Sequence, residues 1–192
     1  MGDKSACSNY RPISLLSKFN KIFERILHHR LYSHLQDFEL LTGHQFGFRA
    51  NSSTSLAVES IYADLLRNYN NGLLTCSLFI DLAKAFDTVN HNILIKKLHQ
   101  YYGLNGTALQ QFTSYLTNCK QDTVVNGAKS NCRNIACGIP QGSTLGPLLF
   151  IMYINDLPFC SKLKQSSMQL IPICLFHTLV YLLCRVWLIM NY

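Results

Sequence analysis

Residues 79–87 of the chain read FIDLAKAFD, and this stretch decides how the rest of the sequence is interpreted. The residues that lead into it, from 74 to 80, are mostly apolar and have the length of a buried strand. A carboxylate at the end of a core strand is costly unless a cation or hydrogen-bond donors meet it, so Asp81 is a candidate metal ligand. The alternative is that Asp81 caps a turn from strand to helix. Taken alone, the stretch favours that plainer interpretation.

Length and composition indicate a folded chain. The 192 residues are enough for one domain with a sizeable core, and 48% apolar with 14% charged residues exclude wholesale disorder. Seventeen basic residues against ten acidic ones give a net charge of +7, which suits a polyanionic partner but does not identify one.

The eight cysteines include no C-x-x-C pair, so their spacing does not predict a zinc site. The amino terminus begins with polar residues and does not resemble a signal peptide. We therefore expect reduced, mostly buried thiols in an intracellular protein of the cytoplasm or nucleus.

Two amphipathic helices are expected early in the chain. The first starts after Ser17, a possible cap, and its apolar residues at helical spacing are Phe19, Ile22, Phe23, Ile26, Leu27, Leu31 and Leu35. Its other positions are rich in Lys and Arg, which suits either a phosphate backbone or plain solvation. The second helix spans residues 53–70, with Gly72 as its stop, and its apolar side carries Val58, Ile61, Leu65 and Tyr69.

Two glycine-containing loops stand out. Residues 43–49 (GHQFGFR) present Arg49, whose guanidinium is suited to a phosphate group or simply to solvent. Residues 138–147 (GIPQGSTLGP) precede an apolar helix expected over 148–157. The flexible backbone beside Gln141 suits close approach to a base or sugar, whereas the alternative is a loop that leads into the helix with Ser143 as its cap.

The segment between these two landmarks is expected to contain helices and a hairpin. Asn90 begins a helix that runs to about residue 102, and a second helix covers 108–117. Residues 123–127 predict a strand and a turn, with a return strand over 131–137.

Taken in order, five stretches resemble the reverse transcriptases of non-LTR (LINE-like, Jockey-type) retrotransposons. They are NYRPISL at 9–15, QFGFR at 45–49, FIDLAKAFD at 79–87, GIPQGS through Leu-Phe at 138–150, and YINDLP at 153–158. Each stretch is weak evidence by itself, but several in the family's order make coincidence a poor explanation.

The resemblance implies an α+β fold, the fingers and partial palm of a right-hand polymerase, rich in helix and with a small antiparallel sheet. Residues 1–72 correspond to fingers and residues 73–160 to a partial palm, while the apolar tail at 161–192 does not match the family. The activity implied is RNA-templated DNA synthesis with Mg²⁺, and the partners implied are an RNA template, a DNA primer and deoxynucleoside triphosphates. The sequence predicts no oligomeric state.

The same resemblance assigns roles within FIDLAKAFD. Asp81 corresponds to the family's catalytic aspartate and would bind the Mg²⁺ ions. Phe86 corresponds to the aromatic residue that gates the sugar 2′ position. Asp87 matches the family's Phe-Asp pair but is not a metal ligand in that mapping.

Other residues are assigned to the nucleotide. Arg49 would reach the triphosphate from the fingers, and Gln141 with Gly142 would line the nucleotide and template site. The backbone near the triphosphate would be that of Leu82, Ala83, Lys84 and Ala85.

The family's other metal-binding carboxylates lie in an aromatic-Ala-Asp-Asp hairpin, but no acidic residue follows Asp156 here. We therefore expect a truncated and inactive reverse-transcriptase fragment whose strand over 74–80 is left partly unpaired. The alternatives are a non-catalytic nucleic-acid-binding module and, as the lesser one, a product held at a membrane by its tail. The tail itself has four explanations: a frameshift, an in-frame loss of the aspartates near FHTLVY at 176–181, a membrane segment, or an unrelated core helix.

Overall fold

The structure, a computed structural model, describes most of the chain, namely residues 13–43, 45–73, 75–82, 84–117, 119–157, 173–175 and 179–186. For the strand residues 76–81, 173–175 and 179–186 it describes the backbone alone. The chain divides into two compact units, each made of two stretches. The first unit is Met1–His34 with Phe86–Phe150, and the second is Leu35–Ala85 with Ile151–Tyr192.

Helix α1 (Lys18–Asp37) starts after Ser17, whose hydroxyl accepts a hydrogen bond from the amide of Asn20 at 3.2 Å. Its buried side consists of Glu24, Leu27, Leu31 and Leu35, which share one face because side chains three and four residues apart lie together. Before Leu27, the apolar residues of the helix at helical spacing are not buried. The exposed residues there are Phe19, Ile22, Phe23 and Ile26.

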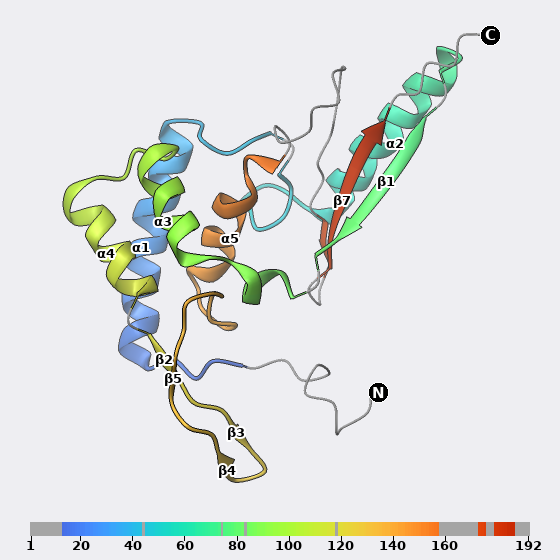
Figure 1. Cartoon of the computed structure of the whole chain (residues 1–192). Helices are drawn as coiled ribbons and strands as arrows, with labels where there is room; N and C mark the ends of the chain where they lie inside the picture. Colours follow the sequence, from blue (N-terminus) through green and yellow to red (C-terminus); the bar gives the residue numbers. More distant parts are fainter. Residues whose placement is uncertain are drawn as a thin grey trace. The chain divides into compact units, whose positions relative to one another are not determined.

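Helices α3 (His91–Gln100) and α4 (Gly106–Leu116) belong to the first unit and pack against each other (Figure 1). Asn90 caps α3, since its side chain accepts a hydrogen bond from the amide of Ile93 at 3.2 Å. Gly103, at φ 67°, lies between the two helices in the left-handed region that glycine favours. Both helices and the Asn90 cap are as the sequence predicts.

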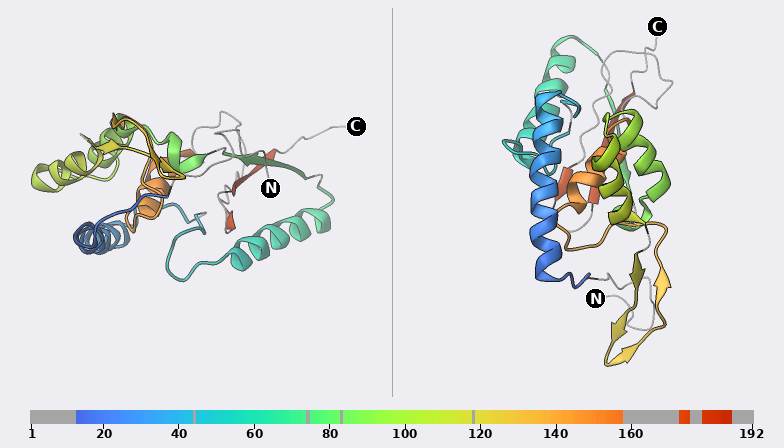
Figure 2. Two further views of the ribbon diagram at one scale, coloured as in Figure 1. Left: turned by 90° about the horizontal axis from the view of Figure 1, so that it is seen from below. Right: turned by 90° about the vertical axis from the view of Figure 1, so that its left-hand side faces the viewer.

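A hairpin of two short ladders extends from the first unit (Figure 2). Asn126 (φ 50°) and Gly127 (φ 83°) form its tip, as expected for the Asn-Gly turn of a β-hairpin. The return strand is shorter than the predicted range 131–137. The four strands are β2 (Lys120–Gln121), β3 (Val124–Val125), β4 (Ala128–Lys129) and β5 (Arg133–Asn134).

Helix α2 (Thr54–Asn70) lies in the second unit and is capped by Ser53, whose hydroxyl accepts from the amide of Leu56 at 3.2 Å. The predicted apolar side is not its buried side. Its buried residues are Ala57, Asp64 and Asn68, whereas Val58, Leu65 and Tyr69 are exposed.

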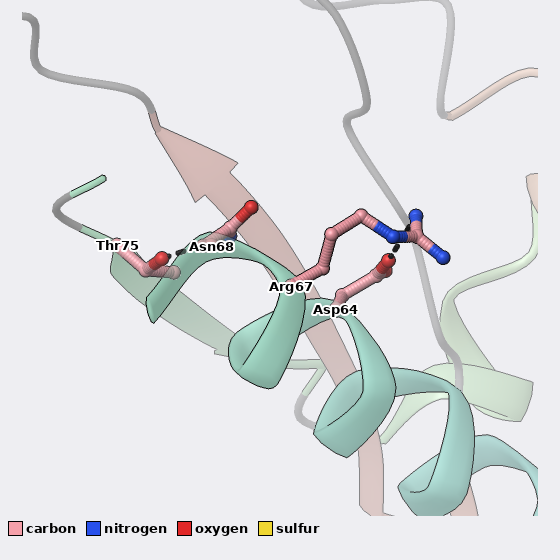
Figure 3. A network of polar contacts seen from close by, with 4 residues as sticks. All are labelled: Asp64, Arg67, Asn68 and Thr75. Atoms are coloured by element: carbon pink, nitrogen blue, oxygen red, sulfur yellow. Dashed lines mark hydrogen bonds and ion pairs between the residues drawn. The ribbon is translucent and has the colours of Figure 1, made fainter. Parts of the chain in front are cut away.

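Two buried residues of α2 make polar contacts (Figure 3). The Asn68 side-chain amide donates to the Thr75 hydroxyl at 2.9 Å, which ties the end of α2 to the residue before the first strand. Asp64 pairs with Arg67 at 3.3 Å on the same helix.

The second unit also contains an antiparallel sheet of strand order β1-β7-β6, formed by β1 (Cys76–Asp81), β7 (Leu179–Val186) and β6 (Ile173–Leu175). The register pairs Asp81 with Tyr181, and every residue of β1 has a partner in β7. The fold is therefore helix-rich with a small antiparallel sheet, as predicted.

The sheet corrects two expectations about the tail. The strand that carries Leu78 and Ile80 does not lose its partner, because the tail supplies β7. The described part of the tail is also not the core helix that one explanation proposes, since it forms strands. Among the described residues, no helix is both long and apolar enough to cross a membrane.

Helix α5 (Gly146–Ile154) is the most deeply buried helix, and its residues from 148 to 152 are all within the core. It starts two residues before the predicted position and ends before residue 157. Its first turn follows the GIPQGS loop in the sequence and belongs, like that loop, to the first unit.

The burial pattern of α1 is testable with two matched truncations. Leu31 is 4% exposed and Ile22 is 58% exposed. Leu31→Ala is expected to lower the free energy of unfolding by about 2–5 kcal/mol, because it leaves a cavity in the core. Ile22→Ala is expected to change it by about 0.5 kcal/mol. Urea unfolding followed by circular dichroism measures both, and equal losses would contradict the exposed position of Ile22.

Candidate functional site

The loop at 138–146 forms a tight turn in the first unit. The amide of Ser143 donates to the carbonyl of Pro140 at 3.1 Å, which closes the turn around Gln141 and Gly142. Gly142 has φ 101°, a conformation that side chains rarely adopt. The amide of Ser14 donates to the carbonyl of Gln141 at 2.9 Å. Ser14, from the NYRPISL stretch, therefore contacts the GIPQGS stretch directly.

A second contact joins the turn to the end of FIDLAKAFD. The amide of Ile139 donates to the carbonyl of Phe86 at 2.9 Å, and the amide of Gly138 donates to the carbonyl of Val89 at 2.8 Å. A Cβ on Gly138 would lie 3.1 Å from the carbonyl oxygen of Asp87, and its φ is 94°. Only glycine allows this approach of the two backbones.

The side chain of His91 strengthens the same junction. Its Nε2 lies 2.6 Å from the carbonyl oxygen of Gly138, and the ring is 5% exposed. Since a carbonyl can only accept, His91 carries a proton on Nε2.

Two of the predicted site residues meet their neighbours here. The Gln141 side-chain amide donates from Nε2 to Oδ1 of Asp87 at 3.1 Å, and both side chains are half-buried. The Phe86 ring lies against that of Phe150, with the ring centroids 4.8 Å apart. Asp87 therefore orients Gln141, a role that the sequence did not suggest.

Ser143 caps the helix that follows, as one of the two sequence interpretations holds. Its hydroxyl oxygen accepts from the amides of Leu145 at 3.1 Å and Gly146 at 3.0 Å. The hydroxyl of Tyr115, on α4, lies 2.9 Å from the same oxygen.

Glu24 completes this cluster from α1. It is 1% exposed, and its two oxygens accept from the Tyr115 hydroxyl at 2.7 Å and from the amide of Thr144 at 2.8 Å. Burial raises the pKa of Tyr115 above its ordinary value of 10, and Glu24 adds to the rise while the hydrogen bond with Ser143 opposes it. Tyr115 therefore remains a neutral hydroxyl donor to the carboxylate.

Arg49 lies in the second unit, where it stabilises its own loop. Its Nη1 donates to the carbonyls of Thr42 at 2.7 Å and Gln45 at 3.4 Å. Asn155 holds the same loop, because its Oδ1 accepts from the amide of Thr42 at 3.0 Å and its Nδ2 donates to the carbonyl of Leu40 at 2.9 Å.

The other predicted residues also belong to the second unit. Asp81 ends β1, and its side chain is outside the described part of the structure, as is Ala83. Leu82 is half-buried, Lys84 is exposed with φ 53°, and Ala85 is buried. Gln141, Gly142 and Phe86 thus belong to the first unit, where Gln141 contacts Asp87, the residue after Phe86. Arg49 and Asp81 lie in the second unit.

The described side chains do not form a metal site. Within that part of the chain, no three His, Cys, Asp or Glu residues lie close enough to hold an ion. Three cysteines are described there as free thiols, and Cys132 and Cys137 are exposed, so the expectation of mostly buried thiols is wrong for these two.

Sequence reasoning missed Glu24, Tyr115 and Asn155. A signal for Glu24 was present, since an acidic residue occupies the stripe shared by Leu27 and Leu31, where a core position is expected to be apolar. Asn155 lies within the YINDLP stretch, but nothing in its pattern reveals which backbone groups it contacts. Tyr115 has no distinguishing signal among the chain's ten tyrosines.

Comparison with known proteins places these contacts in a family context. Residues 2–176 match the family described as reverse transcriptase (RNA-dependent DNA polymerase). The chain is 37% identical over 156 residues to the probable RNA-directed DNA polymerase from transposon X-element of Drosophila melanogaster, covering 79% of the chain and 16% of the relative. It is 37% identical over 155 residues to the corresponding protein from transposon BS and 32% identical over 155 residues to that from mobile element jockey, both of the same organism. In each of these the match covers 78% of the chain and 16% of the relative.

Gly138→Ala tests the contact at the centre of the site. The added Cβ meets the Asp87 backbone and forces an unfavourable φ, so we expect a loss of about 1–3 kcal/mol in the free energy of unfolding. Gly43→Ala is the matched control, because a Cβ there meets nothing within 4 Å. Chemical denaturation of both variants provides the measurement. A Gly138→Ala protein as stable as the control would show that the two backbones are not in contact.

Proposed function

Because the chain belongs to the reverse transcriptase (RNA-dependent DNA polymerase) family, we propose that the turn at 138–146 is the nucleotide- and template-facing part of an RNA-directed DNA polymerase site. The chain covers 16% of the length of the relatives named above, so the activity of those whole proteins is a proposal for this chain. In this proposal residues 1–72 are fingers and residues 73–160 are part of a palm.

The observation that carries the proposal is the hydrogen bond from Gln141 to Asp87 beside Gly142. It fixes the amide of Gln141 before any ligand binds, which lowers the entropy lost on binding. Gly142 has no side chain, so a base or sugar has room to approach the backbone. Phe86, braced by Phe150, is suited to contact the sugar in the role that the family resemblance assigns to it.

We further propose roles for the residues of the second unit. Asp81 lies at the end of a hydrogen-bonded strand, which holds a side chain more rigidly than a loop does. Arg49 and the backbone of residues 82–85 would contact the triphosphate. Arg49 donates to two carbonyls of its own loop, so any contact with a phosphate must use its other guanidinium nitrogens or replace those bonds.

We propose that this chain by itself does not catalyse DNA synthesis. Asp81 is the one carboxylate that the resemblance assigns to the metal ions, and no Asp or Glu follows Asp156. A single carboxylate is a poor match for two divalent ions that must also lose part of their hydration. β6 and β7 form a hairpin next to β1, which is where the family places its remaining aspartates, but residues 176–178 read FHT.

A second candidate is a nucleic-acid-binding module without catalysis. The surface of α1 favours it, because Lys18, Lys21 and Arg25 are exposed whereas Glu24, the one acidic residue between 18 and 34, is buried. The exposed charge on this part of the helix is therefore entirely positive, which suits a phosphate backbone.

Binding and primer extension test the proposed inactivity and the proposed basic binding face. We expect the chain to bind an RNA template annealed to a DNA primer with an affinity that falls as salt rises, and to add no nucleotide in the presence of Mg²⁺ and deoxynucleoside triphosphates. Asp81→Ala should leave the affinity unchanged. Combined Lys18→Gln and Lys21→Gln should weaken binding and reduce its salt dependence, whereas Lys96→Gln, an exposed lysine of α3, serves as the control.

Fluorescence anisotropy and gel-resolved extension provide the two measurements. Mg²⁺-dependent extension that Asp81→Ala abolishes would refute the proposed inactivity. An affinity that does not respond to salt would refute binding through the basic face of α1.

A further inference from the structure

We propose that Glu24 is a positioning residue for the turn at 138–146. This inference rests on the proposed function of that turn and adds a residue to it. Glu24 lies on α1, outside the five motif stretches named above, and reaches the turn through Thr144 directly and through Tyr115 and Ser143.

The hydrogen atoms in this cluster can be assigned by elimination. Tyr115 has one hydroxyl proton and gives it to Glu24, since a carboxylate only accepts. The contact between Tyr115 and Ser143 must then use the proton of Ser143. The Ser143 oxygen is left to accept from the amides of Leu145 and Gly146. Ser143 therefore has one orientation that satisfies all of its partners.

The cluster also satisfies three consecutive amides where α5 begins. The amide of Thr144 meets Glu24, and those of Leu145 and Gly146 meet Ser143. The first amides of a helix have no partner within it and carry partial positive charge, so a carboxylate is favourable there. Both oxygens of Glu24 therefore have hydrogen-bond donors although the residue is 1% exposed.

The geometry connects Glu24 to Gln141 through a short path. Ser143 closes the turn by donating its amide to the carbonyl of Pro140, so an altered Ser143 shifts Gln141 and Gly142. Gln141 is otherwise held by Ser14 at its carbonyl and by Asp87 at its side chain. Glu24 holds the residues that follow Gly142, through Thr144 and through Tyr115 and Ser143.

A residue that only fills the core would have a different signature. Tyr115→Phe keeps the ring but removes the hydroxyl that links Glu24 to Ser143. Glu24→Gln keeps the shape and one acceptor, whereas Glu24→Leu removes both acceptors. Positioning by hydrogen bonds predicts a graded response, with Glu24→Gln between the wild-type chain and Glu24→Leu. Tyr101→Phe, which removes a hydroxyl from a side chain that is 64% exposed, is the matched control.

Amide hydrogen exchange of the full chain measures the effect at individual residues. In Tyr115→Phe we expect exchange at residues 144–146 to accelerate at least tenfold, while the amides of α3 exchange as in the wild type and Tyr101→Phe changes neither. Tyr115→Phe carries the test even if Glu24→Leu fails to fold. Unchanged exchange at 144–146, or an equal increase throughout α3, would overturn the proposal.

Affinity for the RNA–DNA primer–template supplies the link to the site. We expect Tyr115→Phe to weaken it severalfold, with partial recovery for Glu24→Gln relative to Glu24→Leu. Faster exchange at 144–146 with an unchanged affinity would overturn the positioning role. A wild-type chain that does not bind the primer–template would instead refute the proposed function, and the exchange result alone would then decide whether Glu24 holds the turn.

Discussion

The close approach of Gly138 to the backbone of Asp87 is the constraint on which the described site depends. At this point backbone hydrogen bonds join the end of FIDLAKAFD to the start of GIPQGS. The amide of Ile139 donates to the carbonyl of Phe86, and the amide of Gly138 donates to the carbonyl of Val89. The contact brings the side chain of Asp87 within 3.1 Å of Gln141. A Cβ at 138 would lie 3.1 Å from the carbonyl oxygen of Asp87, so a larger residue there requires the two backbones to shift.

The two units have different kinds of support. In the first, buried polar side chains hold a turn whose backbone does not belong to a helix or a strand, which is how a loop becomes rigid enough to present a ligand-binding residue. In the second, Asp81 lies on a strand that is paired along its whole length. Both arrangements are expected of a family whose catalysis depends on positioning more than on covalent chemistry. The chain belongs to the family. Its proposed inactivity is a separate matter, which depends on the number of carboxylates that can bind the metal ions.

Local signals in the sequence predicted the local structure well. Ser17, Asn90 and Ser143 cap helices, and Asn126 with Gly127 forms the hairpin tip, because these preferences depend on bonds between residues close in sequence. Apolar periodicity was a poorer guide. It grouped Phe19 and Ile22 with the apolar residues of α1, and Val58 with the apolar side of α2. These three residues are exposed, whereas Glu24, Asp64 and Asn68 are buried.

The reason is that a buried polar residue is recognised only through its partners. The partners of Glu24 are 91 and 120 residues away in the sequence, at Tyr115 and Thr144. The motifs pointed to the turn itself but not to the residues that hold it. Cross-linking of the chain to an RNA–DNA primer–template by ultraviolet light, followed by identification of the attached tryptic peptide, tests the central claim most directly. The account predicts attachment to the peptide of residues 134–162, which contains the turn. Attachment confined to residues 121–133, in the hairpin, would contradict it.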